Sequence, residues 1–185
     1  MEMKSALGGL SLDFVTPMDL GINESPPEEG STFEDNALHK ARFFFDRSRL
    51  PTIADDSGIA VEALKNELGL NTRRWGAGPA ATDDEWIALF LKRMEKENNR
   101  RAHFHCSIAY IDAMGTPHVF EGDCLGIITP SLEAPYLPGL PISACFKPEG
   151  CDKVFSALSI DEKNCVSHRG RALGNLRKFL SLHLT

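Results

Sequence analysis

Ile53-Ala54-Asp55-Asp56-Ser57-Gly58-Ile59 is the stretch that decides how this chain folds. An apolar run, Pro51 to Ala54, ends in two adjacent carboxylates, a hydroxyl and a glycine, and apolar residues resume at Ile59. The pattern predicts a buried strand at 52–54 that delivers both acids to the rim of a sheet, where chemistry is usually placed. Adjacent carboxylates repel each other, so they need a nearby positive charge, most commonly a divalent cation.

Asp55 and Asp56 point in opposite directions if the strand continues through them. One acid then faces a cleft, and the other supports the backbone or a loop. The alternative is that both acids simply end the strand and that Ser57 caps the next helix. The spacing alone gives the two interpretations equal weight.

Composition bounds the class of protein. The chain has 185 residues, 42% hydrophobic and 25% charged, which predicts one soluble domain (1–185) with a real core. A net charge of −6 argues against nonspecific binding of DNA or RNA, but local cations or a metal can still hold a phosphorylated small molecule. No apolar run approaches the ~20 residues that span a bilayer, and the first residues lack the apolar core of a signal peptide. Five scattered cysteines favour a reduced, cytoplasmic protein.

A zinc site is not expected, although His103, His105 and Cys106 are close in the sequence. The residues around them alternate like a strand, so the cysteine points away from the two histidines. Their spacing is also poor for the usual zinc motifs.

The rest of the chain predicts a mixed α/β fold, because helical and strand patterns alternate. Helices are expected at 1–10, 33–48, 61–64, 82–96 and 160–183, the last with a break at 167–170. Strands are expected at 12–15, 102–112, 117–121 and 122–129, besides 52–54. Ser31 or Thr32 and then Thr82 are expected N-caps, each followed by acids in the first turn. Residues 130–148 are rich in proline yet apolar, so they should fold over the site or pack at an interface.

Three further groups carry charge that chemistry could use. The loop 26–30 supplies more acids, although by composition a solvated loop is the favoured interpretation. Lys40 lies on the helix that follows, and Arg73-Arg74 either clamp phosphates or make surface ion pairs. These cations and acids indicate metal-assisted chemistry on a phosphorylated ligand.

A compact group of cations lies near the C-terminus, where Lys163 precedes Ser167-His168-Arg169-Gly170-Arg171. Histidine can hydrogen-bond a base or a phosphate, and arginine can do so with two donors. The alternative is a helix C-cap at Gly170.

Four segments, taken together and in this order, resemble the motifs of a known family. They are Thr32-Phe33-Glu34-Asp35-Asn36-Ala37-Leu38-His39-Lys40-Ala41, Ala54-Asp55-Asp56-Ser57-Gly58, Thr72-Arg73-Arg74-Trp75, and Glu162-Lys163-Asn164 followed by Ser167-His168-Arg169-Gly170-Arg171-Ala172-Leu173. The chain resembles, over nearly its whole length, the inosine/xanthosine triphosphate pyrophosphatases, which hydrolyse deaminated purine nucleoside triphosphates to the monophosphate and pyrophosphate.

The resemblance implies an elongated mixed β-sheet flanked by helices, two lobes with a central cleft, and a homodimer. It also implies roles for seven residues. Asp56 would be the general base and a Mg²⁺ ligand, and Ser57 would touch the substrate. The substrate's phosphates and base would be bound by Lys40, Arg74, Lys163, His168 and Arg169, the last two reading the 6-oxo group of the purine.

Three departures from the family pattern matter. The usual first strand with its Thr-x-Asn-x-x-Lys phosphate loop does not precede Met1-Glu2-Met3-Lys4, so either the natural start lies upstream or the protein works without that loop. The Phe-Gly-Tyr-Asp base-pocket motif is replaced by other residues at 139–146. The second metal acid falls on Pro27, and Glu28, one residue later, is our candidate.

These departures keep two other functions open. One is a catalytically weakened or non-catalytic nucleotide-binding protein on the same scaffold. The other is a pyrophosphatase for another modified nucleotide.

Overall fold

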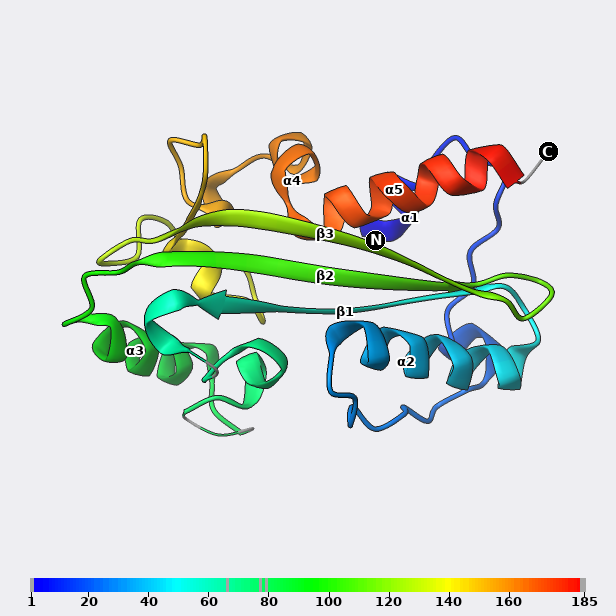
Figure 1. Ribbon diagram of the computed structural model, residues 1–185, viewed down its shortest axis with the longest axis horizontal. Helices are drawn as coiled ribbons and strands as arrows, with labels where there is room; N and C mark the ends of the chain where they lie inside the picture. The colour runs from blue at the N-terminus through cyan, green and yellow to red at the C-terminus, as the bar shows by residue number, and fades with distance from the viewer. Residues whose placement is uncertain (1, 66, 77, 79, 184–185) are drawn as a thin grey trace. The chain divides into compact units, whose positions relative to one another are not determined.

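A computed structural model of the chain describes the backbone of residues 2–65, 67–76, 78 and 80–183 (Figure 1). The side chains of Glu2, Ser5, Arg73 and Arg74 lie outside the described part. The helices are α1 (Glu2–Ala6), α2 (Phe33–Ser48), α3 (Asp83–Met94), α4 (Ile160–Val166) and α5 (His168–His183). The strands are β1 (Thr52–Val61), β2 (Arg101–Ile111), β3 (Pro117–Ile128) and β4 (Phe146–Pro148), which form one sheet in the order β1-β2-β3-β4. The expected α/β class is confirmed.

The chain divides into two compact units. Unit 1 comprises Met1–Ser57, Cys106–Gly122 and His168–Thr185, and unit 2 comprises Gly58–His105 and Asp123–Ser167. Each long strand contributes one part of its length to each unit, because β1, β2 and β3 all continue across the division.

In unit 1 helices cover both faces of the sheet (Figure 1). On one face α2 packs Ala37, Ala41 and Phe45 against Ala109 and Ile111 of β2. On the other face α1 and α5 pack against the alternate residues of β2, a cluster that includes Leu7, Cys106, Ile108, Tyr110, Leu173, Leu176 and Leu180. The two-residue period of β2 therefore sends neighbouring side chains to different helices.

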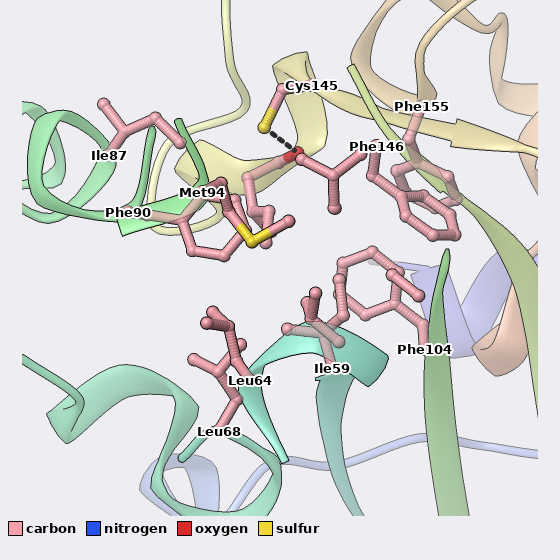
Figure 2. Packing of buried hydrophobic residues seen from close by; sticks show 14 of the residues in the cluster. Ile59, Leu64, Leu68, Ile87, Phe90, Met94, Phe104, Cys145, Phe146 and Phe155 are labelled. Atoms are coloured by element: carbon pink, nitrogen blue, oxygen red, sulfur yellow. Dashed lines mark hydrogen bonds between the residues drawn. The ribbon is translucent and has the colours of Figure 1, made fainter. Parts of the chain in front are cut away.

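Unit 2 has its own core, in which α3 packs against the strands (Figure 2). Phe104 on β2 and Phe146 on β4 meet edge to face, with ring centroids 4.8 Å apart. On α3, Phe90 stacks on Trp86 at 5.3 Å. Residues 130–148, which we expected over the site or at an interface, instead place Ile142, Cys145 and Phe146 in this core.

The predicted N-caps of α2 and α3 are confirmed. Thr32 accepts a hydrogen bond from the backbone N–H of Asp35, and the Asp35 carboxylate accepts one from the N–H of Thr32. Thr82 and Glu85 form the same reciprocal pair at the start of α3. Such capping boxes satisfy backbone donors that a helix start leaves without partners.

Several predicted boundaries are wrong. β1 continues through the two acids to Val61 instead of ending at Ala54, so the acids lie within the strand and not at the rim. Residues 12–15 form no strand, and 117–121 and 122–129 are one strand, β3. The three-residue strand β4 was missed because it lies in the proline-rich stretch. The alternative of a helix C-cap at Gly170 is wrong, because Gly170 lies inside α5. The helix break falls at Ser167, the C-cap of α4, within the expected range 167–170.

Within the described residues, the helices are all too short or too polar to cross a bilayer.

Candidate active site

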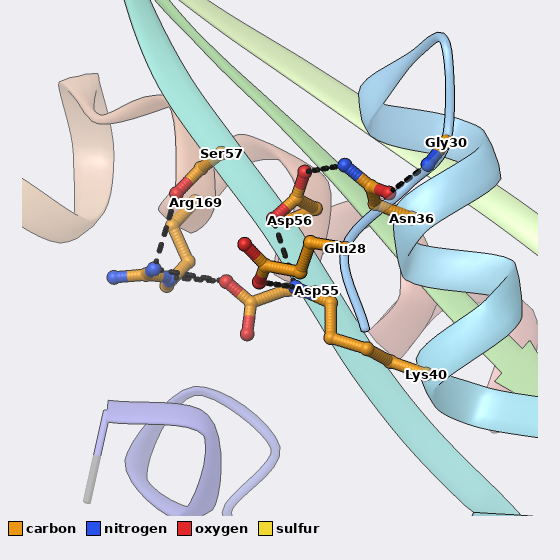
Figure 3. Close-up of polar contacts among 8 residues, drawn as sticks. All are labelled: Glu28, Gly30, Asn36, Lys40, Asp55, Asp56, Ser57 and Arg169. Atoms are coloured by element: carbon orange, nitrogen blue, oxygen red, sulfur yellow. Dashed lines mark hydrogen bonds and ion pairs between the residues drawn. The ribbon is translucent and has the colours of Figure 1, made fainter. Parts of the chain in front are cut away.

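The two acids of β1 point to opposite faces of the sheet in unit 1 (Figure 3). Ala54 packs against the α2 cluster and Ile53 against the α5 cluster. Continuing this alternation, Asp55 meets α5 and Asp56 meets α2, as their hydrogen bonds show. Extended backbone through both residues therefore gives each carboxylate a different set of partners.

Asp56 is held by two side chains of α2, one on each carboxylate oxygen. Lys40 Nζ lies 2.8 Å from Oδ1, and Asn36 Nδ2 donates to Oδ2 at 3.1 Å. Residues 36 and 40 are four positions apart, so they lie on the same helix face. These two contacts orient the Asp56 carboxylate. Its side chain is only 13% exposed, so much of the surrounding water is excluded.

The loop before α2 is attached to the same group. Glu28 Oε1 lies 3.2 Å from Lys40 Nζ, and the backbone N–H of Gly30 donates to Asn36 Oδ1 at 2.8 Å. A Cβ at position 30 would come within 2.6 Å of that oxygen, so only glycine fits without a shift. Two parallel links, one ionic and one through an amide, therefore connect the loop to Asp56.

Lys40 is the centre of this arrangement. Desolvation of its ammonium opposes the charged form, but hydrogen bonds and charge attraction from Asp56 and then Glu28 outweigh it and raise the pKa of Lys40. The ammonium is therefore charged at neutral pH, between two carboxylates.

On the opposite face, Asp55 holds Arg169 of α5. Arg169 donates to Asp55 Oδ2 from Nε at 3.1 Å and from Nη2 at 2.8 Å, and Nη2 also lies 3.4 Å from Ser57 Oγ. The start of α5 is close to β3, because a Cβ on Gly122 would lie 2.2 Å from the backbone oxygen of His168. Glycine at 122 is thus needed for α5 to begin where Arg169 can reach Asp55.

Among the predicted site residues, Glu28, Lys40 and Asp56 are brought together, and Arg169 donates directly to Ser57 Oγ as well as to Asp55. His168 begins α5 in unit 1 and is 5% exposed. The other two lie in unit 2: Lys163 on α4, and Arg74, which ends a 3₁₀ helix (Gly69–Arg74) and whose side chain is outside the described residues.

A cavity of about 730 Å³ in unit 1 adjoins these groups. Lys40, Asp55 and Arg169 contribute to its lining, together with apolar side chains such as Phe14 and Phe44. Its size is within the range of small-molecule sites in proteins.

The donor set suits Mg²⁺ bound together with a phosphate ligand. Among the described residues there is no group of three or more His, Cys, Asp or Glu that could hold a metal ion. Glu28 and Asp56 nevertheless place one carboxylate oxygen each beside the same cation, the Lys40 ammonium. Mg²⁺ commonly takes one or two protein carboxylates and completes its shell with water and substrate phosphates.

Sequence reasoning missed Asn36 and Gly30 as parts of this site. A signal was available for the asparagine, because it precedes Lys40 by four residues on a predicted helix. No local pattern indicates that the amide of Gly30 meets it, because that contact depends on the path of the loop.

Comparisons with known proteins agree with this architecture. The sequence profile of the Ham1 family matches residues 1–179. A dITP/XTP pyrophosphatase of Leptospira interrogans is 41% identical over 179 residues, covering 97% of this chain and 90% of that protein. The dITP/XTP pyrophosphatase of Escherichia coli K12 is 36% identical over 176 residues, covering 93% and 87%.

Solved structures give the same result. A HAM1 protein from Coxiella burnetii matches with a TM-score of 0.88 at 32% identity, over 98% of this chain and 92% of that one. A nucleoside-triphosphatase / dITP/XTP pyrophosphatase from Mycobacterium abscessus matches with a TM-score of 0.72 at 34% identity, over 93% and 90%. The resemblance expected from the four motifs is confirmed. This chain belongs to the Ham1 family.

Proposed function

We propose that this chain hydrolyses deaminated purine nucleoside triphosphates (ITP, dITP and XTP) to the monophosphate and pyrophosphate, with Mg²⁺ as cofactor. The observation that carries the proposal is the group Glu28–Lys40–Asp56, in a member of a family whose named relatives are dITP/XTP pyrophosphatases. The group combines a fixed carboxylate, a second acid and a cation, which is what hydrolysis of a metal-bound triphosphate needs.

Asp56 acts as the general base in this proposal. The oxygen of a water molecule bonds to the α-phosphorus while the bond from that phosphorus to the α–β bridging oxygen breaks. Pyrophosphate leaves with the bridging oxygen, and a proton of the water passes to the Asp56 carboxylate. Mg²⁺ bound by Asp56 and Glu28 would supply neutralisation of the triphosphate charge. Asn36 keeps the Asp56 carboxylate in one orientation during this step, because it holds Oδ2.

The cations bind and select the substrate. Lys40, Lys163 and Arg74 contact phosphate or base, and Ser57 contacts the substrate beside Arg169. Arg169 and His168 read the purine, with arginine donors directed at the 6-oxo acceptor. Adenine presents an amino donor at that position, and two donors facing each other leave polar groups unpaired, which disfavours ATP.

The 139–146 segment is the reason for a second candidate, because its residues differ from the usual base-pocket motif of the family. It lacks the aromatic residue and the aspartate of the usual base pocket, and Phe146 is buried in the core of unit 2. A pyrophosphatase for another modified nucleotide is therefore the second candidate function.

We also propose that the protein acts in the cytoplasm as a homodimer. All five cysteines are free thiols, which suits a reducing compartment. The dimer is the usual assembly implied by the family resemblance, and light scattering of the purified protein tests it.

Pyrophosphate release from a panel of nucleoside triphosphates tests the function. With Mg²⁺ present, we expect ITP or XTP to be hydrolysed faster than ATP. Faster release of pyrophosphate from a pyrimidine nucleoside triphosphate or from another modified nucleotide would support the second candidate. Nucleotide binding by calorimetry without hydrolysis over hours would instead identify a non-catalytic binding protein.

A further inference from the structure

The Lys40 ammonium lies between the two carboxylates assigned to the metal. Nζ is 2.8 Å from Asp56 Oδ1 and 3.2 Å from Glu28 Oε1, and the Lys40 side chain is 18% exposed (Figure 3). The two acids come from separate parts of the chain, a loop and a strand, and Lys40 is the charge that joins them.

The carboxylates are positioned partly without the lysine. Asn36 holds the second oxygen of Asp56, and Gly30, two residues after Glu28, is fixed by its N–H to the same amide. The amide link therefore keeps both the strand acid and the acidic loop in place when the ionic link is altered.

We propose that Lys40 is a built-in counter-cation, and that its ammonium and a divalent cation compete for the same oxygens of Asp56 and Glu28. The inference rests on the proposed function, because that function assigns the metal to these two acids. Two cations cannot share these oxygens at close range without strong repulsion, so one must move when the other binds.

The competition has a consequence for the order of binding. Divalent cations bind weakly to the protein alone, because the ammonium already compensates the two acids. A metal that arrives with a triphosphate has additional ligands, and the displaced Lys40 is then available to a phosphate oxygen on its flexible four-carbon stem. The Lys40 ammonium thus contacts the two acids before the metal binds and a phosphate oxygen of the substrate afterwards.

A purely structural ion pair and a competing cation predict different metal affinities when the lysine is removed. If Lys40 only stabilises the fold, Lys40→Met lowers stability and gives no gain in metal affinity. If Lys40 competes with the metal, the same change removes the ammonium from between the Asp56 and Glu28 carboxylates, and divalent cations bind more tightly.

The test is a titration of the protein with Mn²⁺ in the absence of nucleotide. The electron paramagnetic resonance signal of free Mn²⁺ reports how much of the metal is bound. We expect Lys40→Met to lower the dissociation constant about tenfold or more relative to wild type, which is about 1.4 kcal/mol or more. The matched control is Arg47→Met, which removes the same charge from the same helix where Arg47 pairs with Glu24 at 3.0 Å. Arg47→Met should change the constant by less than about twofold.

Two further variants make the result specific. Lys40→Gln retains much of the side-chain length and a hydrogen-bond donor, so it serves where Lys40→Met fails to fold as judged by circular dichroism. Adding Glu28→Gln to either lysine variant should remove the gain in Mn²⁺ affinity. Lys40 variants that bind Mn²⁺ no more tightly than Arg47→Met would overturn the proposal.

The outcome can be separated from that of the proposed function. Tighter Mn²⁺ binding by the Lys40 variants, with no pyrophosphate release by the wild type, would refute the enzyme and retain the competition. Pyrophosphate release by the wild type, without tighter Mn²⁺ binding by the variants, would support the enzyme and refute the competition.

Discussion

At the scale of single residues, the neighbours Asp55 and Asp56 have separate partners because a strand directs them to different helices. Asp56 meets Asn36 and Lys40, whereas Asp55 meets Arg169. The sequence predicted that the two acids would alternate only if the strand continued through them, and a strand that ends at the acids was an equal alternative. It did not predict their partners, because these depend on how α2 and α5 cover the sheet.

Asn36→Ala tests the link between the acidic loop and Asp56. Asn36 is 4% exposed, and its loss leaves the Gly30 N–H and Asp56 Oδ2 each without this partner. We expect the free energy of unfolding in urea to fall by about 1–3 kcal/mol, as for other buried polar groups that lose a partner. We also expect the kcat for ITP to fall, because the Asp56 carboxylate is no longer held.

The control for this variant is His39→Ala, an exposed position on the same helix. It should leave both the unfolding free energy and kcat close to those of wild type. An Asn36→Ala protein with unchanged kcat would show that Asp56 does not depend on the amide.

Asp55→Asn tests whether Asp55 serves the chemistry or positions Arg169. Without a carboxylate partner the guanidinium is held less firmly, so contacts to the substrate weaken while Asp56 keeps its own partners. We expect the KM for ITP to rise several-fold to about tenfold, the cost of a weakened charge-assisted hydrogen bond, with a small change in kcat. Steady-state kinetics decide, and a loss that falls mainly on kcat would contradict the positioning role.

At the scale of elements, local signals predicted helix starts well and strand lengths poorly. Thr32 and Thr82 cap their helices through contacts within three residues, so the sequence contains the whole motif. β1 was predicted too short because Asp55 and Asp56 are poor strand residues by propensity. The sheet and the ion pairs on both of its faces stabilise them there, and such contacts are not visible in a local window.

Gly122→Ala tests the close approach of β3 and α5. The added Cβ would lie 2.2 Å from the backbone oxygen of His168, so α5 must shift. We expect a loss of about 1–3 kcal/mol in the free energy of unfolding, as for other overpacked sites. Binding of the substrate should also weaken, because Arg169 lies in the first turn of α5 and moves with the displaced end of that helix.

Gly174→Ala is the control, because Gly174 lies on α5, the helix that Gly122 approaches, and its Cβ would meet nothing within 4 Å. A helix-interior glycine that becomes alanine should stabilise the protein by up to about 0.5–1 kcal/mol. Equal effects of the two substitutions would contradict the packing argument.

At the scale of the whole molecule, the four motifs in order predicted the family, and the fold class followed from it. Of the predicted site residues, Glu28, Lys40 and Asp56 lie together in unit 1, and Asn36 and Gly30, which the sequence did not single out, hold the same group. The role of residues 130–148 could not be predicted from the sequence. An apolar, proline-rich stretch is equally compatible with a lid, an interface or a core, and only the packing of Ile142 and Phe146 in unit 2 distinguishes these.

Thiol labelling tests the packing of unit 2. Cys106, Cys124 and Cys145 are buried and Cys165 is exposed, and burial raises the pKa of Cys145 to about 12. A buried, protonated thiol reacts slowly. We expect a thiol reagent, followed by mass spectrometry, to modify Cys165 first and Cys145 only on unfolding. Equal labelling rates for these two cysteines in the native protein would contradict the described core.

We propose that Asp56 is the base of a pyrophosphatase selective for deaminated purines. The most direct measurement is pyrophosphate release from ITP and from ATP, with Mg²⁺, by wild type and by Asp56→Asn, which replaces the carboxylate with an amide of similar shape. We predict faster release from ITP than from ATP by wild type, and a loss of roughly 10²–10⁴-fold in the variant, as for removal of a general base. Turnover of ITP by a folded Asp56→Asn protein at the wild-type rate would contradict the account.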